Sequence, residues 1–355
     1  MDSVSGFDIS SDPLLWAVFV SALATLALSG LLVACVLVLR WKTRLGEAFT
    51  ARVRARWRPR FAAVLIGDDV PAERAGAGEL HDVLSLWNQN AAAVKGPARE
   101  RLAEYGRRCG FGEQAAALLA RRSQHDRLLG LASLEHLADR TQFAVALPLA
   151  ADPSPVASLA AARAAIRMDP AGALAALLPQ MLEREDWPVA RLADALREGW
   201  QPGIGDRIAR AFAEVPERHL PRLLSIARVV PAERIAPQVR AVLEGSRDPE
   251  CLCAALRLVA DPRDAPRVRS LLRDPAWAVR LGAVKALARI AVEDDVPRFA
   301  AALSDPEWWV RQRAADALVK LPFLDRAQLE RLREVVSDRY AKDALARALA
   351  EGGMR

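Results

Sequence analysis

The chain repeats itself in LLRDPAWAVRLGAVKALARI, residues 271–290, and ALSDPEWWVRQRAADALVKL, residues 302–321. Nine of these twenty positions are identical at an offset of 31 residues. A unit of this length is typically a helix, a turn and a second helix, and it stacks on its neighbours because it cannot bury its apolar face alone. The repeat therefore predicts an all-α fold, an α-solenoid of stacked helix pairs.

Each copy carries the signals of a helix start and a buried helix face. We expect Asp274 and Asp305 at N-cap positions, where a carboxylate accepts hydrogen bonds from the free amides of the first turn. Pro275 and Pro306 would then occupy the first helical position, where a missing N–H costs nothing. Apolar residues recur at steps of three and four and predict one buried stripe: Val279, Ala283, Ala286, Leu287 and Ile290.

The same period extends towards the N-terminus. The Ala-Leu dipeptide occurs at 255–256, 286–287 and 317–318. Looser copies begin at three further aspartates: Asp152, Asp186 and Asp248. Breaks that contain Pro or Gly separate the apolar runs, and they predict about sixteen to eighteen helices between Glu79 and Ala350.

The motif resembles the short repeats of the HEAT family, which follow D-P-x-x-x-V-R-x-x-A-x-x-A-L. The first copy matches at Asp274, Pro275, Val279, Arg280, Ala283, Ala286 and Leu287. The second copy matches at Asp305, Pro306, Val310, Arg311, Ala314, Ala317 and Leu318. Residues 126–261 follow the pattern only in part, and residues 61–124 hardly at all. The resemblance implies an extended concave face on which such proteins commonly hold partners.

An apolar segment near the N-terminus, residues 14–39, contains no charged residue. As a helix it would extend about 39 Å, against roughly 30 Å for the hydrocarbon core of a bilayer, so we predict a transmembrane helix. The leader, residues 1–13, has three Asp and no Lys or Arg, unlike a cleaved signal peptide. Since Lys and Arg stay on the cytoplasmic side, we expect the leader outside the cytoplasmic membrane and the rest inside.

The residues that follow the span are strongly basic. Residues 1–39 carry a net charge of −3, residues 40–60 carry +7 and residues 61–355 carry only +2, which together give the total of +6. The excess charge therefore lies next to the membrane, where anionic lipid headgroups are the nearest counter-charge, which argues against a nucleic-acid partner. The predicted membrane-surface contacts are Trp41, Arg52, Arg54, Arg56, Arg58 and Arg60.

Apolar residues within this basic segment recur at every fourth position. They are Trp41, Leu45, Phe49, Val53, Trp57 and Phe61. Two interpretations are open: the stripe lies among lipid headgroups, or it packs against the helices that follow. We place a basic juxtamembrane helix at residues 40–66, a linker at 67–78 and the solenoid at 79–351, and we expect Pro59 to end the helix.

One side of the predicted span is small and weakly polar. Ser21, Thr25 and Ser29 lie at steps of four, and Gly30 falls on an adjacent line. Small faces allow transmembrane helices to pack closely. The alternative is chance in an Ala-rich helix, and the sequence leaves both open.

No catalytic or metal-binding motif is present. The four histidines form no H-x-x-H or H-E-x-x-H pair, and the His-Glu dipeptides with which some HEAT-type hydroxylases hold iron are missing. There is no nucleophile elbow, Walker loop or dinucleotide-binding loop. The cysteines form no C-x-x-C pair and are expected to be small buried residues in a reducing compartment. We therefore predict a protein that is not an enzyme and has no metal, cofactor or small-molecule substrate.

Tryptophan is unusually frequent, with nine Trp against two Tyr. Trp277 and Trp308 occupy equivalent repeat positions, and packing between adjacent units is the favoured interpretation. Trp309 has polar helical neighbours, among them Arg313, and is expected to be exposed, as in a binding hot spot. The candidate partner-binding residues are Trp309, Trp308, Trp277 and Arg313. The resemblance implies that Arg280 and Arg311 form ladders with neighbouring aspartates.

The favoured function is a membrane-anchored scaffold that docks another protein, itself membrane-associated, at the cytoplasmic face. The resemblance implies two alternatives: a nucleic-acid-acting protein similar to DNA glycosylases of this fold, and a lyase or modifying enzyme similar to the bilin-attaching proteins. The nearly neutral domain argues against the first, and only the fold supports the second. The residue usage is typical of bacteria, and by analogy the protein is expected to accompany envelope or polysaccharide-export machinery.

Overall fold

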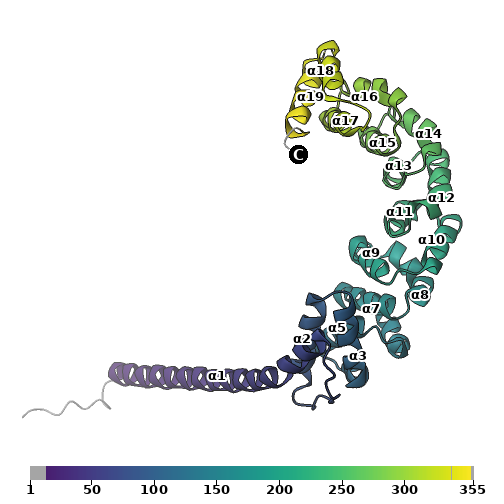
Figure 1. The fold of residues 1–355 in the computed structure, drawn as a ribbon. Coiled ribbons are helices and arrows are strands. Elements are labelled where there is room, and N and C mark those ends of the chain that lie inside the picture. Colours follow the sequence, from purple (N-terminus) through teal and green to yellow (C-terminus); the bar gives the residue numbers. More distant parts are fainter. Residues whose placement is uncertain (1–12, 337, 353–355) are drawn as a thin grey trace, which may run out of the picture. The chain divides into compact units, whose positions relative to one another are not determined.

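The computed structural model describes residues 13–336 and 338–352, which are predominantly helical and contain no strand (Figure 1). The predicted all-α fold is confirmed. The chain divides into two compact units, residues 1–114 and residues 115–355. The helices between residues 80 and 108 pack on the long N-terminal helix and belong to the first unit. A solenoid that begins at residue 79 stays a prediction.

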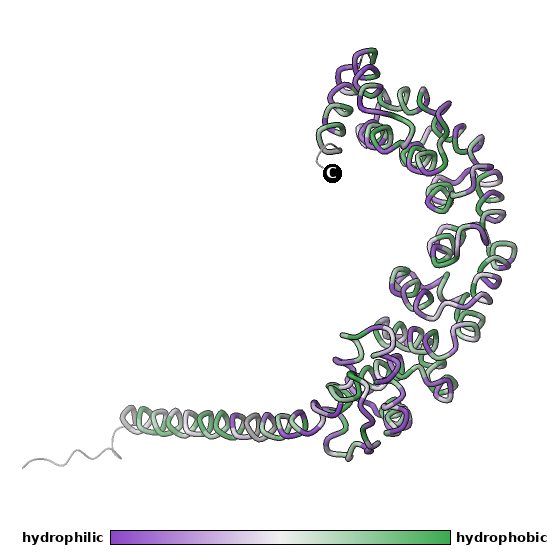
Figure 2. Tube along the Cα trace, in the orientation of Figure 1, coloured by the Kyte–Doolittle hydropathy of each residue, from purple (hydrophilic) through white to green (hydrophobic). Residues whose placement is uncertain are grey.

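The first unit is built on α1 (Pro13–Ile66), an uninterrupted helix of 54 residues. It continues through α2 (Leu80–Ala93) and α3 (Pro97–Arg108), and α4 (Phe111–Leu119) crosses the boundary to the second unit. Within α1, residues Trp16–Val38 form a stretch of 23 residues that is long and apolar enough to cross a membrane, with a mean hydropathy of 2.4. Figure 2 shows this stretch as a nearly continuous hydrophobic run.

The expectation that Pro59 ends the helix is wrong, because α1 runs through it to Ile66. Proline in a helix interior costs about 3 kcal/mol, since it removes one hydrogen bond and crowds the preceding turn. Trp57 and Phe61, on either side of it, are fully buried, with ring centroids 5.7 Å apart. Burying two such side chains contributes about 3–6 kcal/mol, which offsets the proline.

The apolar stripe of the basic segment has a buried C-terminal part and an exposed N-terminal part. Its C-terminal members pack inside the first unit: Val53 is buried, Trp57 lies 6.0 Å from Phe111, and Phe61 lies 6.3 Å from Tyr105, as ring centroids. Phe49 and Trp41 are exposed, with 40% and 64% of their surface accessible. A stripe with a spacing of four winds slowly round a helix, so one flat contact cannot cover all of it.

The second unit stacks helices in two rows. The first row contains α5 (Gln124–Leu137), α7 (Pro155–Met168), α9 (Val189–Glu198), α11 (Leu220–Ala227), α13 (Pro249–Leu256), α15 (Trp277–Ile290), α17 (Trp308–Lys320) and α19 (Arg339–Gly352). The second row contains α8 (Pro170–Glu183), α10 (Pro202–Glu214), α12 (Ala232–Gly245), α14 (Ala265–Leu271), α16 (Val296–Ala302) and α18 (Arg326–Val335), and the short α6 (Phe143–Ala146) precedes α7. Each helix of the first row packs on the next, and from α9 onwards this row lies on the inner side of the curve in Figure 1.

The N-cap predictions for α15 and α17 are wrong. These helices begin at Trp277 and Trp308, two residues after the proline in each copy. Asp274 accepts a hydrogen bond from the Ala276 amide at 2.9 Å, and Asp305 accepts the equivalent bond at 2.8 Å. An Asp-Pro pair favours such a turn, because the carboxylate caps an amide two residues on and the proline fixes the backbone between them.

Candidate interaction surface

The arginines of the repeat motif hold consecutive repeats together. Arg280 of α15 donates two hydrogen bonds to the Asp305 carboxylate, at 2.7 and 2.8 Å, and a further one to the carbonyl of Asp274 at 2.9 Å. Both members of this ion pair are largely buried, with side chains 13% and 8% exposed. The ladder implied by the family resemblance is therefore present, and Arg280 serves the fold.

Arg311 occupies the equivalent place in the last motif copy and takes a different partner. It donates to the backbone carbonyl of Asp305 at 2.7 Å, as Arg280 does to Asp274. Its guanidinium carbon then lies 5.5 Å from the ring centroid of Tyr340, at the start of α19. A cation over an aromatic ring thus replaces the Arg–Asp step where the repeat motif ends.

A second ladder connects the other row of helices. Arg269 of α14 donates to both carboxylate oxygens of Asp295, at 2.7 and 3.0 Å, and Arg240 of α12 donates to Asp264 at 2.6 Å. Asp264 and Asp295 are nearly inaccessible to solvent. Sequence reasoning missed this ladder, although both aspartates stand two residues before a proline at the same offset of 31 residues.

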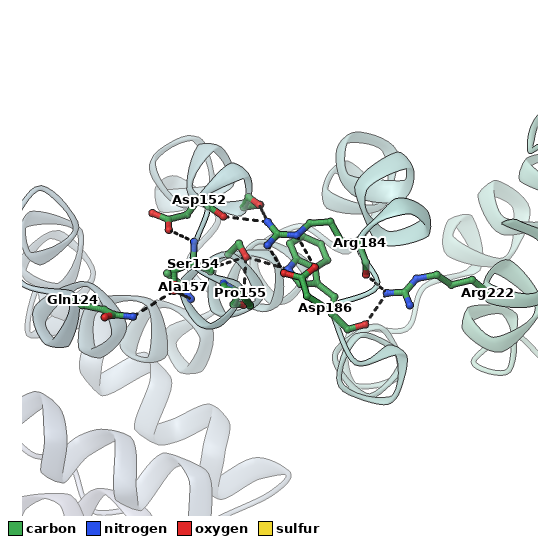
Figure 3. Close-up of polar contacts among 11 residues, drawn as sticks. Gln124, Asp152, Ser154, Pro155, Ala157, Arg184, Asp186 and Arg222 are labelled. Carbon is green, nitrogen blue, oxygen red and sulfur yellow. Dashed lines mark hydrogen bonds and ion pairs between the residues drawn. The ribbon is translucent and has the colours of Figure 1, made fainter.

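Where the repeat motif fades, two arginines bind backbone carbonyls of the preceding repeat. Figure 3 shows Arg184 reaching the carbonyl of Asp152 at 3.1 Å while it pairs with Asp186 at 2.6 Å. Arg222 of α11 donates to the carbonyls of Arg184 and Trp187, both at 2.6 Å, and to that of Met181. Each arginine thereby ties one repeat to the loop of the preceding one.

Three tryptophans stand exposed at the starts of two adjacent helices. Trp277 on α15 is 45% exposed, and Trp308 and Trp309 on α17 are 42% and 56% exposed. Trp277 and Trp308 each stand at the first residue of a helix, ahead of the buried Val279 or Val310. Their packing between adjacent units stays a prediction. Trp309 is exposed as expected, and its ring lies 4.6 Å from that of Trp308 at an interplanar angle of 75°.

The fourth candidate residue lies one helical turn beyond Trp309. Arg313 forms only a loose ion pair with Asp316, at 3.8 Å, and remains 42% exposed. The structure thus brings Trp309, Trp308 and Arg313 together on α17, with Trp277 on the neighbouring α15. Their role in partner binding stays a prediction.

The arginines predicted to contact the membrane divide into two groups. Arg56 and Arg60 serve the first unit: both form ion pairs with Glu73, and their guanidinium carbons lie 5.9 and 5.3 Å from the ring centroid of Trp57. Arg52, Arg54 and Arg58 are exposed on α1. Arg54 and Arg58 form no ion pair within the described part of the chain, and Trp41 is exposed as well.

Two hydroxyls on the small face of the predicted span bind carbonyls of the same helix. Thr25 donates to the carbonyl of Ser21 at 2.7 Å, and Ser21 donates to that of Val18 at 2.9 Å. A Cβ added at Gly30 would meet no atom within 4 Å, and Ser29 is exposed. The face is open along α1, and its packing role stays a prediction.

The cysteines differ in their surroundings. Cys109 and Cys251 are buried, as expected, whereas Cys35 is exposed on the apolar part of α1 because no other helix covers it. Burial raises the pKa of Cys251 to about 12, so its thiolate is strongly disfavoured. Over residues 13–336 and 338–352, no three His, Cys, Asp or Glu side chains are grouped as a metal ion would require.

Comparison with known proteins identifies one part of the chain. Residues 236–318 and 265–350 match the family model of HEAT repeats. Proteins of curated function give no significant match. Among solved structures, an engineered protein is similar over 77% of this chain and 84% of its own, with 13% identity and a TM-score of 0.35.

Proposed function

We propose that the protein is a non-enzymatic scaffold that binds another protein on its solenoid, because residues 236–350 match the family model of HEAT repeats. The exposed indoles of Trp277, Trp308 and Trp309 carry this proposal. An indole left in water gains little for folding, whereas Trp and Arg are enriched among the residues that dominate binding energy at protein interfaces. Arg313, one turn from Trp309, adds a charged group to this surface.

The scaffold is further proposed to be anchored in a bacterial cytoplasmic membrane by the apolar part of α1, with the N-terminus outside and the solenoid inside. The length and composition of Trp16–Val38 support the anchor, and the basic residues that follow support the orientation. Trp41, Arg52, Arg54 and Arg58 are available for anionic headgroups, at up to about 1 kcal/mol for each arginine.

The proposed partner is a membrane-associated protein. The open face of Ser21, Thr25, Ser29 and Gly30 on α1 suits a second transmembrane helix, since small residues let helices approach closely. By analogy with other membrane-bound HEAT proteins, the scaffold would serve as an accessory subunit of an envelope or polysaccharide-export machine.

The test is Trp309→Ala in the full-length protein, with cross-linked partners recovered from membranes. We expect the variant to stay in the membrane, to change the free energy of unfolding by less than about 1 kcal/mol, and to lose its partner. Val335→Ala, at another exposed apolar position, should retain the partner. Val310→Asp should cost several times more stability, because it puts a charge in the core. Equal damage from Trp309→Ala and Val310→Asp would show that Trp309 is core and would remove the proposal's main support.

A further inference from the structure

A basic cleft opens on the first row of helices, between α13 and α15. It has a volume of about 450 Å³, and its floor is small and apolar: Leu256, Ala278, Leu281 and Gly282. The cleft is also lined by four basic residues and no acidic one: Arg228, Arg257, Lys285 and Arg289. Arg289 stabilises the fold, because it donates hydrogen bonds to the backbone carbonyls of Leu256 and Val259 at 2.6 and 3.0 Å. Three basic side chains remain.

These three residues, here called the basic row, belong to consecutive helices. Arg228 directly follows α11, Arg257 directly follows α13, and Lys285 lies within α15. All three are exposed, and none forms an ion pair or side-chain hydrogen bond within the described residues. By contrast, Arg240 and Arg280 of the same unit each pair with an aspartate.

The basic row brings like charges to one cleft, and none of them has an ion-pair partner among the described residues. Partial burial lowers the pKa of Lys285, and the nearby Arg313 and Arg257 lower it further. Such repulsion works against folding, because like charges favour each other's neutral form. The fold alone therefore does not explain the basic row. Binding of an external anion would explain it.

The spacing of the basic row suits an extended chain. Packed helices lie about 8–10 Å apart, so one cation per helix gives steps of roughly that length. An extended peptide in the polyproline II conformation has three residues per turn and rises about 3.1 Å per residue, so carboxylates three residues apart lie on one face and match these steps. Trp277, Leu281 and Lys285 recur at every fourth position of α15, which places an apolar contact beside the charges.

We propose that the basic row binds an extended acidic segment of the partner protein, with carboxylates on Arg228, Arg257 and Lys285 and an apolar side chain against Leu281 and Trp277. This inference rests on the proposed scaffold function and names the chemistry of the partner. A nucleic acid fits less well, because its phosphates are more closely spaced and its binding grooves are strongly basic, whereas residues 61–355 carry only +2.

The test measures fluorescence anisotropy with the full-length protein in neutral detergent. The probe is a labelled peptide with Glu at every third position and a central Leu, compared with the same peptide carrying Gln for Glu and with a single-stranded oligothymidylate. The triple variant Arg228→Gln, Arg257→Gln, Lys285→Gln should weaken binding of the Glu peptide about tenfold or more. A matched variant removes the same charge from exposed positions elsewhere, Arg247→Gln, Arg331→Gln, Arg333→Gln, and should weaken it less than about twofold.

Three outcomes would overturn the proposal: equal binding of the Glu peptide by the unaltered protein and the triple variant, equal binding of the Gln and Glu peptides, and tighter binding of the oligothymidylate than of the Glu peptide. Co-purification separates this inference from the scaffold function. A cross-linked partner that is retained by the triple variant contradicts the basic row and leaves the scaffold standing. Loss of peptide binding in the triple variant, together with no partner for the unaltered protein, supports the basic row and contradicts the scaffold.

Discussion

Asp305 shows how one side chain can serve two neighbouring repeats. It caps the turn before α17 through the Glu307 amide at 2.8 Å and receives both hydrogen bonds of Arg280 from α15. Burial alone would raise its pKa, but the hydrogen bonds from Arg280 and Glu307 outweigh it and hold the pKa below the ordinary Asp value. The folded state therefore favours the carboxylate. This stabilisation is complete above the unfolded-state pKa of about 4 and is lost as the pH falls through the lower folded-state pKa.

Asp305→Asn is therefore expected to lower the free energy of unfolding by about 3 kcal/mol at pH 7, because it leaves the Arg280 charge buried without its partner. The difference from the unaltered protein should begin to shrink below about pH 4 and disappear below the lowered folded-state pKa of Asp305, where the unaltered protein also loses the carboxylate. Urea unfolding followed by circular dichroism at about pH 7 and pH 3 measures this. Asp343→Asn, at an exposed position, should change stability by less than about 0.5 kcal/mol. A loss for Asp305→Asn that does not vary with pH would contradict the role of the charge.

At the scale of the element, Arg222 anchors α11 to the preceding repeat. Its planar guanidinium reaches three backbone carbonyls, two of them at 2.6 Å, at the end of α8 and in the loop that follows. Burial lowers the pKa of Arg222, although Glu185 and Asp186 oppose this shift. The carbonyls would lose their partner if the guanidinium were removed, and unpaired buried acceptors are costly.

Arg222→Ala should reduce the free energy of unfolding by about 2–4 kcal/mol and increase hydrogen exchange in α8 and α9. Arg222→Lys should recover little of this loss, since an ammonium cannot reproduce the planar array of donors. The matched control is Arg210→Ala on α10, which removes one exposed bond to the Asp206 carbonyl at 3.4 Å. If Arg222→Ala proved as mild as this control, the carbonyl contacts would not be what holds these repeats together.

α1 combines two environments in one helix. Its N-terminal part is apolar and uncovered by the chain itself, whereas its C-terminal part buries Val53, Trp57 and Phe61 against the first unit. The two parts belong to one uninterrupted helix, so the same backbone hydrogen-bond pattern continues from the apolar part into the buried part. Any anchor formed by residues 16–38 would therefore be continuous with the core of the first unit.

For the molecule as a whole, the asymmetry of charge predicts the topology. An enzyme reporter that is active only outside the cytoplasm and is fused after Arg355 should be silent, and a reporter active only in the cytoplasm should work, because the basic residues from Arg40 onwards oppose translocation. Reporter activity in intact cells measures this directly. Strong activity of the first reporter would contradict both the orientation and a cytoplasmic scaffold.

The helix pairs and the apolar span could be predicted from the sequence, because both depend on residues that are close together in the chain. The repeat LLRDPAWAVRLGAVKALARI contains its own turn and buried stripe, and the window Trp16–Val38 needs only length and composition. The exposure of Trp309 followed in the same way, from its polar neighbours on one helix. In each case one continuous stretch of the chain carries the information.

Only the tertiary structure decided which residues from distant repeats meet. The passage of α1 through Pro59 depends on aromatic contacts with α3 and Phe111. The exposure of Trp277 and Trp308 depends on where their helices begin. Arg56 and Arg60 differ from the exposed arginines of α1 because they pair with Glu73 of the following loop. The basic row joins side chains about thirty residues apart, and an unmatched charge among paired ones becomes visible only when all its spatial neighbours are known. The periodicity of a helix predicts the direction in which a side chain points. The register between stacked repeats determines which residues that side chain meets.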